Sequence, residues 1–199
     1  MCAKSLLRRQ TLAKMKEQAT QRKELADEDL LEQLCQSPSY ESAHTIATYM
    51  SLPHEVNTRP IIQRMMRDGK RVLIPRTLPG YQLEFVEYDP RNLVRSAFGI
   101  MEPSNNCIVA PDNIDLIHVP ALVMNNAHYR IGYGAGYYDR YLENFSNHTV
   151  STIYSFQLHD FAEDTYDISI DTMLVSPYEY MLSKDTKLQA SQRKLHMQR

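Results

Sequence analysis

Apolar and polar residues alternate along the chain in two patterns, one typical of helices and one of strands. Between residues 4 and 23 apolar side chains recur at Leu7, Leu12 and Met15 with no Gly or Pro between them, which predicts a helix over 4–23. A second helix is expected over 27–35, before Pro38. A third is expected to begin at Thr58 as the N-cap and to end at Gly69.

Short apolar runs separate these helices and predict strands. They cover residues 44–50, 71–75, 83–88, 115–124, 149–156 and 171–176, and the run 115–124 reads as fully buried. A further helix is expected to start near Tyr137. Strands that alternate with helices favour an α/β fold. We therefore expect one domain with a largely parallel central sheet flanked by helices, a Rossmann-like three-layer arrangement.

Composition narrows the classes of protein that this chain can be. Its 199 residues, 43% of them hydrophobic, suffice for one core, and we expect a catalytic domain over 1–183 followed by a basic, polar tail over 184–199. The net charge of −2 gives no general attraction to nucleic acid or membrane, and no segment has the roughly 18 consecutive apolar residues of a membrane span. Three widely spaced cysteines suit a reducing compartment. These features predict a cytoplasmic protein whose partners are neither nucleic acid nor membrane, and we expect it to be a monomer.

The segment RIGYGAGYYDRYL, residues 130–142, holds three of the six glycines in the chain, at Gly132, Gly134 and Gly136. The spacing G-x-G-x-G matches neither the dinucleotide fingerprint nor the Walker motif. A glycine turn between a buried strand and a helix can place backbone amides against a phosphate. A tight turn that needs positive φ explains the same glycines. The glycines alone leave both interpretations open.

The residues around these glycines favour a phosphorylated ligand. Arg130 and Arg140 bracket the turn with cations, and Asp139 offers a hard oxygen ligand for Mg²⁺. Three tyrosines supply flat faces for a heterocycle, at Tyr133, Tyr137 and Tyr138.

Several motifs, in order along residues 4–176, resemble the 5-formyltetrahydrofolate cyclo-ligase (methenyltetrahydrofolate synthetase) family. RIGYGAGYYDRYL is similar to the family signature, and KSLLRR is similar to its ATP-binding helix start. YMSLPHEVNTRPII resembles the substrate segment, FGIMEP the Gly-x-x-Glu-Pro stretch, and YDISIDTMLVS the closing segment with two aspartates.

The resemblance implies an activity and a set of ATP-binding residues. The implied reaction is the ATP-dependent cyclisation of 5-formyltetrahydrofolate to 5,10-methenyltetrahydrofolate, with release of ADP and phosphate and with Mg²⁺ as cofactor. Arg130 and Tyr137 are the implied catalytic residues. The implied ATP-binding residues are Lys4, Arg8, Arg130, Gly132, Tyr133, Gly134, Ala135, Gly136, Tyr137 and Tyr138.

The same resemblance implies the folate and metal ligands. Glu55 would accept hydrogen bonds from the pterin ring and Met50 would pack against it. The implied substrate-binding residues are Met50, Glu55, Tyr133, Gly134, Gly136 and Tyr137. Asp139 and Asp167 are the implied Mg²⁺ ligands, with Asp171 as the rival to Asp167.

One stretch departs from the family pattern, and two other classes of protein remain open. MNNAHYR, residues 124–130, lacks the Asp and Gly that the family has before the arginine. If that Asp shapes the nucleotide site in relatives, either Asn125 or Asn126 substitutes for it here or the activity is weak. One alternative is another nucleotide or sugar-phosphate enzyme on the same scaffold, including a dehydrogenase. The other is a non-enzymatic protein that binds RNA or a partner through its basic N-terminal segment and tyrosines.

Overall fold

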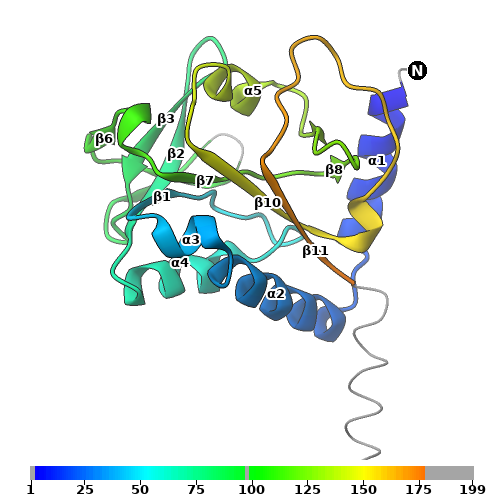
Figure 1. The fold of residues 1–199 in the computed structure, drawn as a ribbon, viewed down its shortest axis with the longest axis horizontal. Coiled ribbons are helices and arrows are strands. Elements are labelled where there is room, and N and C mark those ends of the chain that lie inside the picture. The colour runs from blue at the N-terminus through cyan, green and yellow to red at the C-terminus, as the bar shows by residue number, and fades with distance from the viewer. Residues whose placement is uncertain (1–2, 97–98, 178–199) are drawn as a thin grey trace, which may run out of the picture.

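A seven-stranded mixed sheet forms the centre of the computed structural model, which describes residues 3–96 and 99–177 (Figure 1). The strand order is β11-β10-β7-β1-β2-β3-β6. The first five strands in this order are parallel, and β3 and β6 pair antiparallel at one edge. The sheet strands are β1 (Thr45–Ala47), β2 (Arg71–Leu78), β3 (Gln82–Glu87), β6 (Ile108–Val109), β7 (Leu116–His118), β10 (His148–Tyr154) and β11 (Thr172–Ser176).

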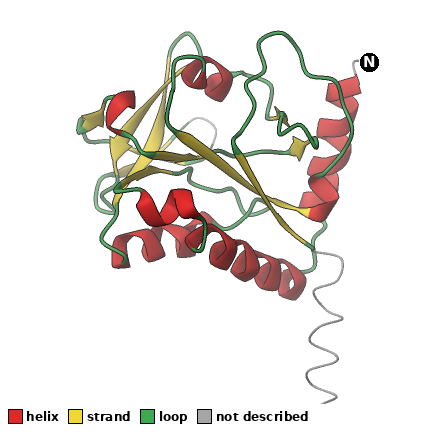
Figure 2. Ribbon diagram, in the orientation of Figure 1, coloured by secondary structure: helices red, strands yellow, loops and turns green. Residues whose placement is uncertain are grey.

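Helices flank both faces of this sheet (Figures 1 and 2). On one face lie α2 (Thr20–Cys35), α3 (Pro38–Ser42) and α4 (Thr58–Arg67), and on the other lies α5 (Tyr137–Leu142). The first helix, α1 (Ala3–Lys16), stands at one end of the sheet beside the small ribbon of β8 (Val123–Met124) and β9 (Arg130–Ile131). The remaining elements are β4 (Leu93–Arg95), β5 (Met101–Pro103), and the 3-10 turns Pro111–Asn113 and Ser155–Gln157. The predicted fold class, a single α/β domain with a largely parallel sheet, is confirmed.

Two clusters of buried side chains hold the layers together, one on each face of the sheet. Leu30 and Leu34 of α2 belong to the larger cluster, and Phe85 of β3 and Ile117 of β7 belong to the smaller. All four are at most 1% exposed. Burying one such side chain contributes about 1.5–3 kcal/mol. Within the described part of the chain, no helix is long and apolar enough to cross a bilayer.

The helix boundaries differ from the prediction in two places. The predicted helix over 4–23 is two helices, and α2 begins at Thr20 rather than at residue 27. The Gln18 side-chain amide lies at the break and donates to the Met15 and His54 carbonyl oxygens. The Met15 carbonyl, in the last turn of α1, thereby gains a hydrogen-bond partner. The N-cap of α4 is Asn57 instead of Thr58: the Asn57 side chain accepts from the Arg59 amide.

The strand predictions were right in position and wrong in some lengths. The run 115–124 is two short strands, β7 and β8, with Pro120 between them. Proline has no N–H to donate to a neighbouring strand, and Pro120 lies in the interruption between the two strands. Four strands of two or three residues, β4, β5, β6 and β9, were not predicted. Cys2 and the predicted tail 184–199 lie outside the described residues.

Candidate active site

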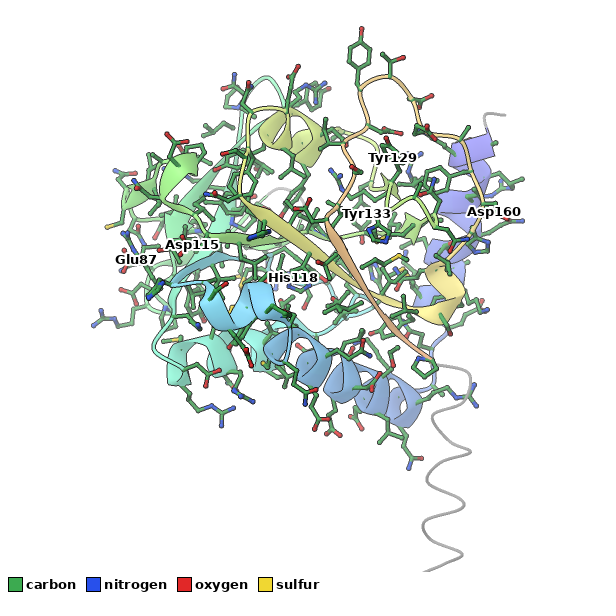
Figure 3. The ribbon with its side chains drawn as sticks, in the orientation of Figure 1. Glu87, Asp115, His118, Tyr129, Tyr133 and Asp160 are labelled. Carbon is green, nitrogen blue, oxygen red and sulfur yellow. The ribbon has the colours of Figure 1, made fainter. Side chains whose placement is uncertain are left out.

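Three segments that each follow the carboxyl end of a parallel strand meet at the end of the sheet where α1 stands. They follow β1, β7 and β10, and cover residues 48–57, 119–136 and 155–170. In Figure 3, Tyr129, Tyr133 and Asp160 from two of these segments lie towards this end, whereas Glu87 and Asp115 lie at the opposite end. The carboxyl edge of a parallel sheet is where α/β proteins bind ligands. The hydrogen bonds described below join the second and third segments to α1, and Tyr133 joins the first segment to the second.

The glycine turn, residues 132–136, is shaped by positive φ angles and held by two arginines. Gly134 has φ of 103° and Gly136 has φ of 71°, so the turn interpretation holds for both of these residues. The Arg8 Nε donates to the Gly132 carbonyl oxygen at 2.7 Å. Arg140 donates to the Ala135 carbonyl oxygen at 2.7 Å. Because α5 has only six residues, any anion at this turn would depend on the loop amides and nearby cations more than on a helix dipole.

Lys4 and Arg8, one turn apart on α1, both point into this site. The Lys4 Nζ lies 2.6 Å from Asp164 Oδ2 and 2.5 Å from Asp167 Oδ2. Burial opposes the charge on Lys4, but hydrogen bonds to the two carboxylates outweigh it and raise its pKa. Lys4 and Arg8 therefore face the carboxyl edge of the sheet, where each has a partner within the protein. These two cations of the basic N-terminal helix are not part of a surface that could bind RNA.

Arg130 is the deeply buried cation of the site, with 6% of its surface exposed. It lies 3.2 Å from Asp139 Oδ1 and donates to the Ile168 carbonyl oxygen at 3.1 Å. Burial lowers the pKa of Arg130, and the neighbouring Asp139 opposes this effect. The Tyr138 ring lies under the guanidinium, 5.9 Å from its central carbon, and packs against Phe85 in the smaller core cluster. Arg130 therefore carries a fixed positive charge at the base of the glycine turn.

Asp139 and Asp167, the two expected metal ligands, both lie near Arg130. Asp171, the alternative to Asp167, lies elsewhere. Asp139 accepts from the Ile168 amide at 3.4 Å, next to Asp167, and both carboxylates stabilise the charge on Arg130. Asp171 instead accepts from the backbone amide and hydroxyl of Thr149, at the amino end of β10. Asp171 therefore lies at the amino end of β10, away from the candidate site at its carboxyl end.

A metal ion would need more ligands than these two side chains supply. Within residues 3–96 and 99–177, no three His, Cys, Asp or Glu side chains are grouped to hold a metal ion. Mg²⁺ commonly takes one or two carboxylates and completes its shell with water and substrate phosphates. Asp139 and Asp167 fit that donor set, and each is now paired with a cation that phosphate oxygens could draw away.

Glu55 is a buried carboxylate beside the glycine turn, 6% exposed. Its Oε2 accepts from the Leu52 amide at 2.7 Å, and its Oε1 accepts from the Tyr133 hydroxyl at 2.7 Å. Burial raises the pKa of Glu55, and these two hydrogen bonds act against that rise. His54 Nε2 lies 2.9 Å from the same hydroxyl. A ligand with N–H donors could replace Tyr133 at this carboxylate.

Met50 and Tyr137, also expected to bind ligand, contact the core and Tyr81, respectively. Met50, partly buried, packs against the larger core cluster in the segment that carries Glu55. Tyr137 meets Tyr81 edge-to-face, with ring centroids 5.9 Å apart, where the β2–β3 turn approaches α5. Tyr137 therefore forms a contact between the β2–β3 turn and the start of α5.

Two parts of the site were not predicted from the sequence. Asp164 is the second partner of Lys4, and its segment, residues 155–170, has no regular pattern beyond a cluster of acidic residues. His118, at the carboxyl end of β7, lies 3.0 Å from Thr48 Oγ1 and 2.9 Å from Thr152 Oγ1. This buried bridge links β7 to its two parallel neighbours, β1 through Thr48 and β10 through Thr152.

Together these features define an α/β protein with a glycine turn, three converging cations and two carboxylates at the carboxyl edge of its sheet. Residues 1–175 match the 5-formyltetrahydrofolate cyclo-ligase family, and the chain belongs to that family.

Named relatives agree with this assignment. The 5-formyltetrahydrofolate cyclo-ligase of Escherichia coli K12 is 31% identical over 121 residues, which cover 58% of this chain and 66% of that protein. The cyclo-ligase of Mycoplasma pneumoniae is 25% identical over 175 residues, 86% of this chain and 97% of that protein. The match therefore covers slightly less than two thirds of the length of the E. coli protein.

Two solved structures have the same fold. The 5,10-methenyltetrahydrofolate synthetase of Aquifex aeolicus superposes with a TM-score of 0.78 at 29% identity, covering 87% of this chain and 90% of that one. The synthetase of M. pneumoniae gives a TM-score of 0.73 at 25% identity, covering 87% and 98%.

Proposed function

We propose that this protein converts 5-formyltetrahydrofolate to 5,10-methenyltetrahydrofolate with consumption of ATP. The observation that carries the proposal is a glycine turn that has Arg8 and Arg130 beside it and that also contacts the buried Glu55. Lys4, one helical turn from Arg8, adds a third cation next to Asp167. One ligand site on this edge suits a polyphosphate and the neighbouring site suits a ring with N–H donors. Membership of the cyclo-ligase family supports the pairing of these two ligands.

The chemistry requires activation of a formamide oxygen, which is a poor leaving group. In the proposed reaction the formyl oxygen attacks the γ-phosphorus of ATP, the bond to the β-phosphate oxygen breaks, and ADP leaves. N10 then attacks the formyl carbon, the C–O bond breaks with its electron pair on the departing phosphate, and N10 loses its proton. Phosphoryl transfer depends mainly on positioning and charge neutralisation. The cations at this edge are suited to that task.

Each residue of the site takes a role in this proposal. Lys4, Arg8 and Arg130 neutralise the ATP phosphates, and Glu55 accepts hydrogen bonds from the pterin ring. Asp139 and Asp167 would hold Mg²⁺, which supplies charge neutralisation on the phosphates when bound. Because Lys4 now pairs with Asp167, phosphates that attract Lys4 release this carboxylate. Tyr137 remains a candidate for the reacting end of the folate.

The proposal is tested by following the near-ultraviolet absorbance of the methenyl product, with and without MgATP. Wild type is expected to form product only with MgATP, and Asp139→Ala is expected to lose most of that activity. Asp160→Ala is the matched control, because Asp160 is an exposed carboxylate near the same site. Absence of product from wild type at high enzyme concentration would contradict the proposal.

A further inference from the structure

The turn between β2 and β3 carries a tyrosine in a backbone conformation that bulky residues avoid. Leu78 at the end of β2 pairs with Gln82 at the start of β3, so the turn consists of residues 79–81. Gly80 has φ of 76° and Tyr81 has φ of 60°. Glycine adopts positive φ readily, whereas the Cβ of Tyr81 makes this conformation strained. Such strain persists where the surrounding structure fixes the residue, and strained residues cluster at functional sites.

The ring of Tyr81 contacts the helix that follows the glycine turn. Although Tyr81 is 56% exposed, its ring meets Tyr137 edge-to-face, and the central guanidinium carbon of Arg140 lies 5.3 Å from the ring centroid. Aromatic faces attract cations within about 6 Å. Both partners belong to α5, beside which the β2–β3 turn lies (Figure 1). The strained tyrosine therefore joins the β2–β3 turn to the start of α5.

Arg140 in turn holds the backbone of the glycine turn. Its guanidinium donates to the Ala135 carbonyl oxygen at 2.7 Å. The Ala135 carbonyl and the Gly136 N–H belong to one planar trans peptide group, in which they point in opposite directions. A contact that fixes the oxygen therefore also fixes the direction of the Gly136 N–H. Arg8 makes the equivalent contact with the Gly132 carbonyl oxygen, so two arginines hold the turn at its two ends.

We propose that Tyr81 is a positioning residue for MgATP: its ring fixes the Arg140 guanidinium, which holds the peptide group between Ala135 and Gly136. Arg140 is an exposed residue with a long side chain, and such a side chain samples many rotamers unless a partner restricts it. The inference rests on the proposed function, since that function assigns the glycine turn to the nucleotide phosphates. Tyr81 acts on the nucleotide through Arg140 and is not itself a catalytic residue.

Tyr81→Gly is the direct test and Tyr81→Phe the matched control. Glycine removes the ring and adopts the φ of 60° without strain, whereas phenylalanine keeps both the ring and the strain. For Tyr81→Gly we expect the KM for MgATP to rise about fivefold, as for one lost exposed cation–π contact, while kcat and the KM for 5-formyltetrahydrofolate stay within about twofold. Tyr81→Phe should match wild type in all three constants, because both ring contacts are retained.

Thermal unfolding separates this role from a general defect in the fold. In Tyr81→Gly the relief of backbone strain opposes the loss of the ring contacts, so the Tm should stay within about 4 °C of wild type. A raised KM for MgATP at an almost unchanged Tm is not expected of a merely structural residue. Should Tyr81→Gly fail to fold, Tyr81→Asn is measured in its place with the same kinetic result expected, because asparagine tolerates positive φ.

Arg140→Ala tests the route by which Tyr81 acts. This substitution should raise the KM for MgATP at least as much as Tyr81→Gly does, because it removes the contact with the Ala135 carbonyl directly. The double variant should be no worse than Arg140→Ala alone, since the ring then has no guanidinium to hold. Additive effects of the two substitutions would contradict a route through Arg140.

Three other results would overturn the role of Tyr81. The first is an unchanged KM for MgATP in Tyr81→Gly, and the second is the same rise in Tyr81→Gly and Tyr81→Phe. The third is a fall in kcat or a rise in the KM for 5-formyltetrahydrofolate as large as the change for MgATP, which would assign the effect to Tyr137 or to the fold. Wild type that forms no methenyl product would instead refute the proposed function.

Discussion

His118 provides a quantitative test of how the edge of the sheet beneath the site is held. Its ring is fully buried between Thr48 and Thr152, and burial lowers its pKa from 6.5 to about 3. The folded state therefore keeps this histidine neutral, whereas the unfolded chain takes up a proton below about pH 6.5. The stabilising contribution is complete above that pH and is lost as the pH falls towards 3.

The size of the effect follows from the difference between the two pKa values. Each pH unit below the unfolded pKa costs about 1.4 kcal/mol, so between about pH 8 and about pH 5 the loss is about 2 kcal/mol. We expect His118→Gln, which cannot titrate, to lose about 2 kcal/mol less than wild type over that interval. At about pH 8 the variant itself should be less stable by about 1–3 kcal/mol, because the threonine partners are disturbed.

The assay is urea unfolding of wild type and His118→Gln at both pH values, with the free energy of unfolding extrapolated to water. The other histidines are common to both proteins, so the difference between the two pH dependences isolates His118. Equal losses in the two proteins would show that His118 gains its proton in the folded state, and the buried bridge would then be refuted.

Three further substitutions test the site. Gly136→Ala should destabilise the protein by about 1 kcal/mol or more in thermal unfolding, because φ is 71° and the new Cβ would lie 2.9 Å from an Arg140 nitrogen; an unchanged Tm would contradict the strained turn. Tyr133→Phe frees Glu55 Oε1, so calorimetry should show unchanged or tighter binding of 5-formyltetrahydrofolate without nucleotide; loss of binding would mean that the hydroxyl contacts the substrate. Arg8→Lys keeps the charge but lacks the guanidinium that holds Gly132, so the KM for MgATP should rise at least severalfold, and wild-type kinetics would exclude that contact.

The sequence alone was enough to predict the class of fold and the position of the glycine turn before α5. The apolar runs predicted the strands of an α/β domain, because the spacing of apolar residues follows the period of each element. The glycine turn was visible as a cluster of three glycines, and positive φ at Gly134 and Gly136 explains two of them. Lys4 and Arg8 lie one turn apart on α1, as their i, i+4 spacing predicted, and their role in ATP binding stays a prediction.

What the sequence could not predict depends on contacts between residues far apart in the chain. Asp164 joins Lys4 across 160 residues, and no periodic pattern marks an irregular segment. The choice between Asp167 and Asp171 was open because both stand in the same motif, four residues apart. Only the fold separates them, with Asp171 bonded to Thr149 at the far end of β10.

The route of the formyl oxygen tests the proposed reaction most directly. 5-Formyltetrahydrofolate labelled with ¹⁸O in its formyl group is incubated with the protein and MgATP, and the released inorganic phosphate is analysed by mass spectrometry. Transfer of the γ-phosphoryl group to the formyl oxygen predicts one labelled oxygen in the phosphate for every methenyl product formed. Methenyl product accompanied by unlabelled phosphate, or ATP cleavage with no methenyl product, would contradict the account.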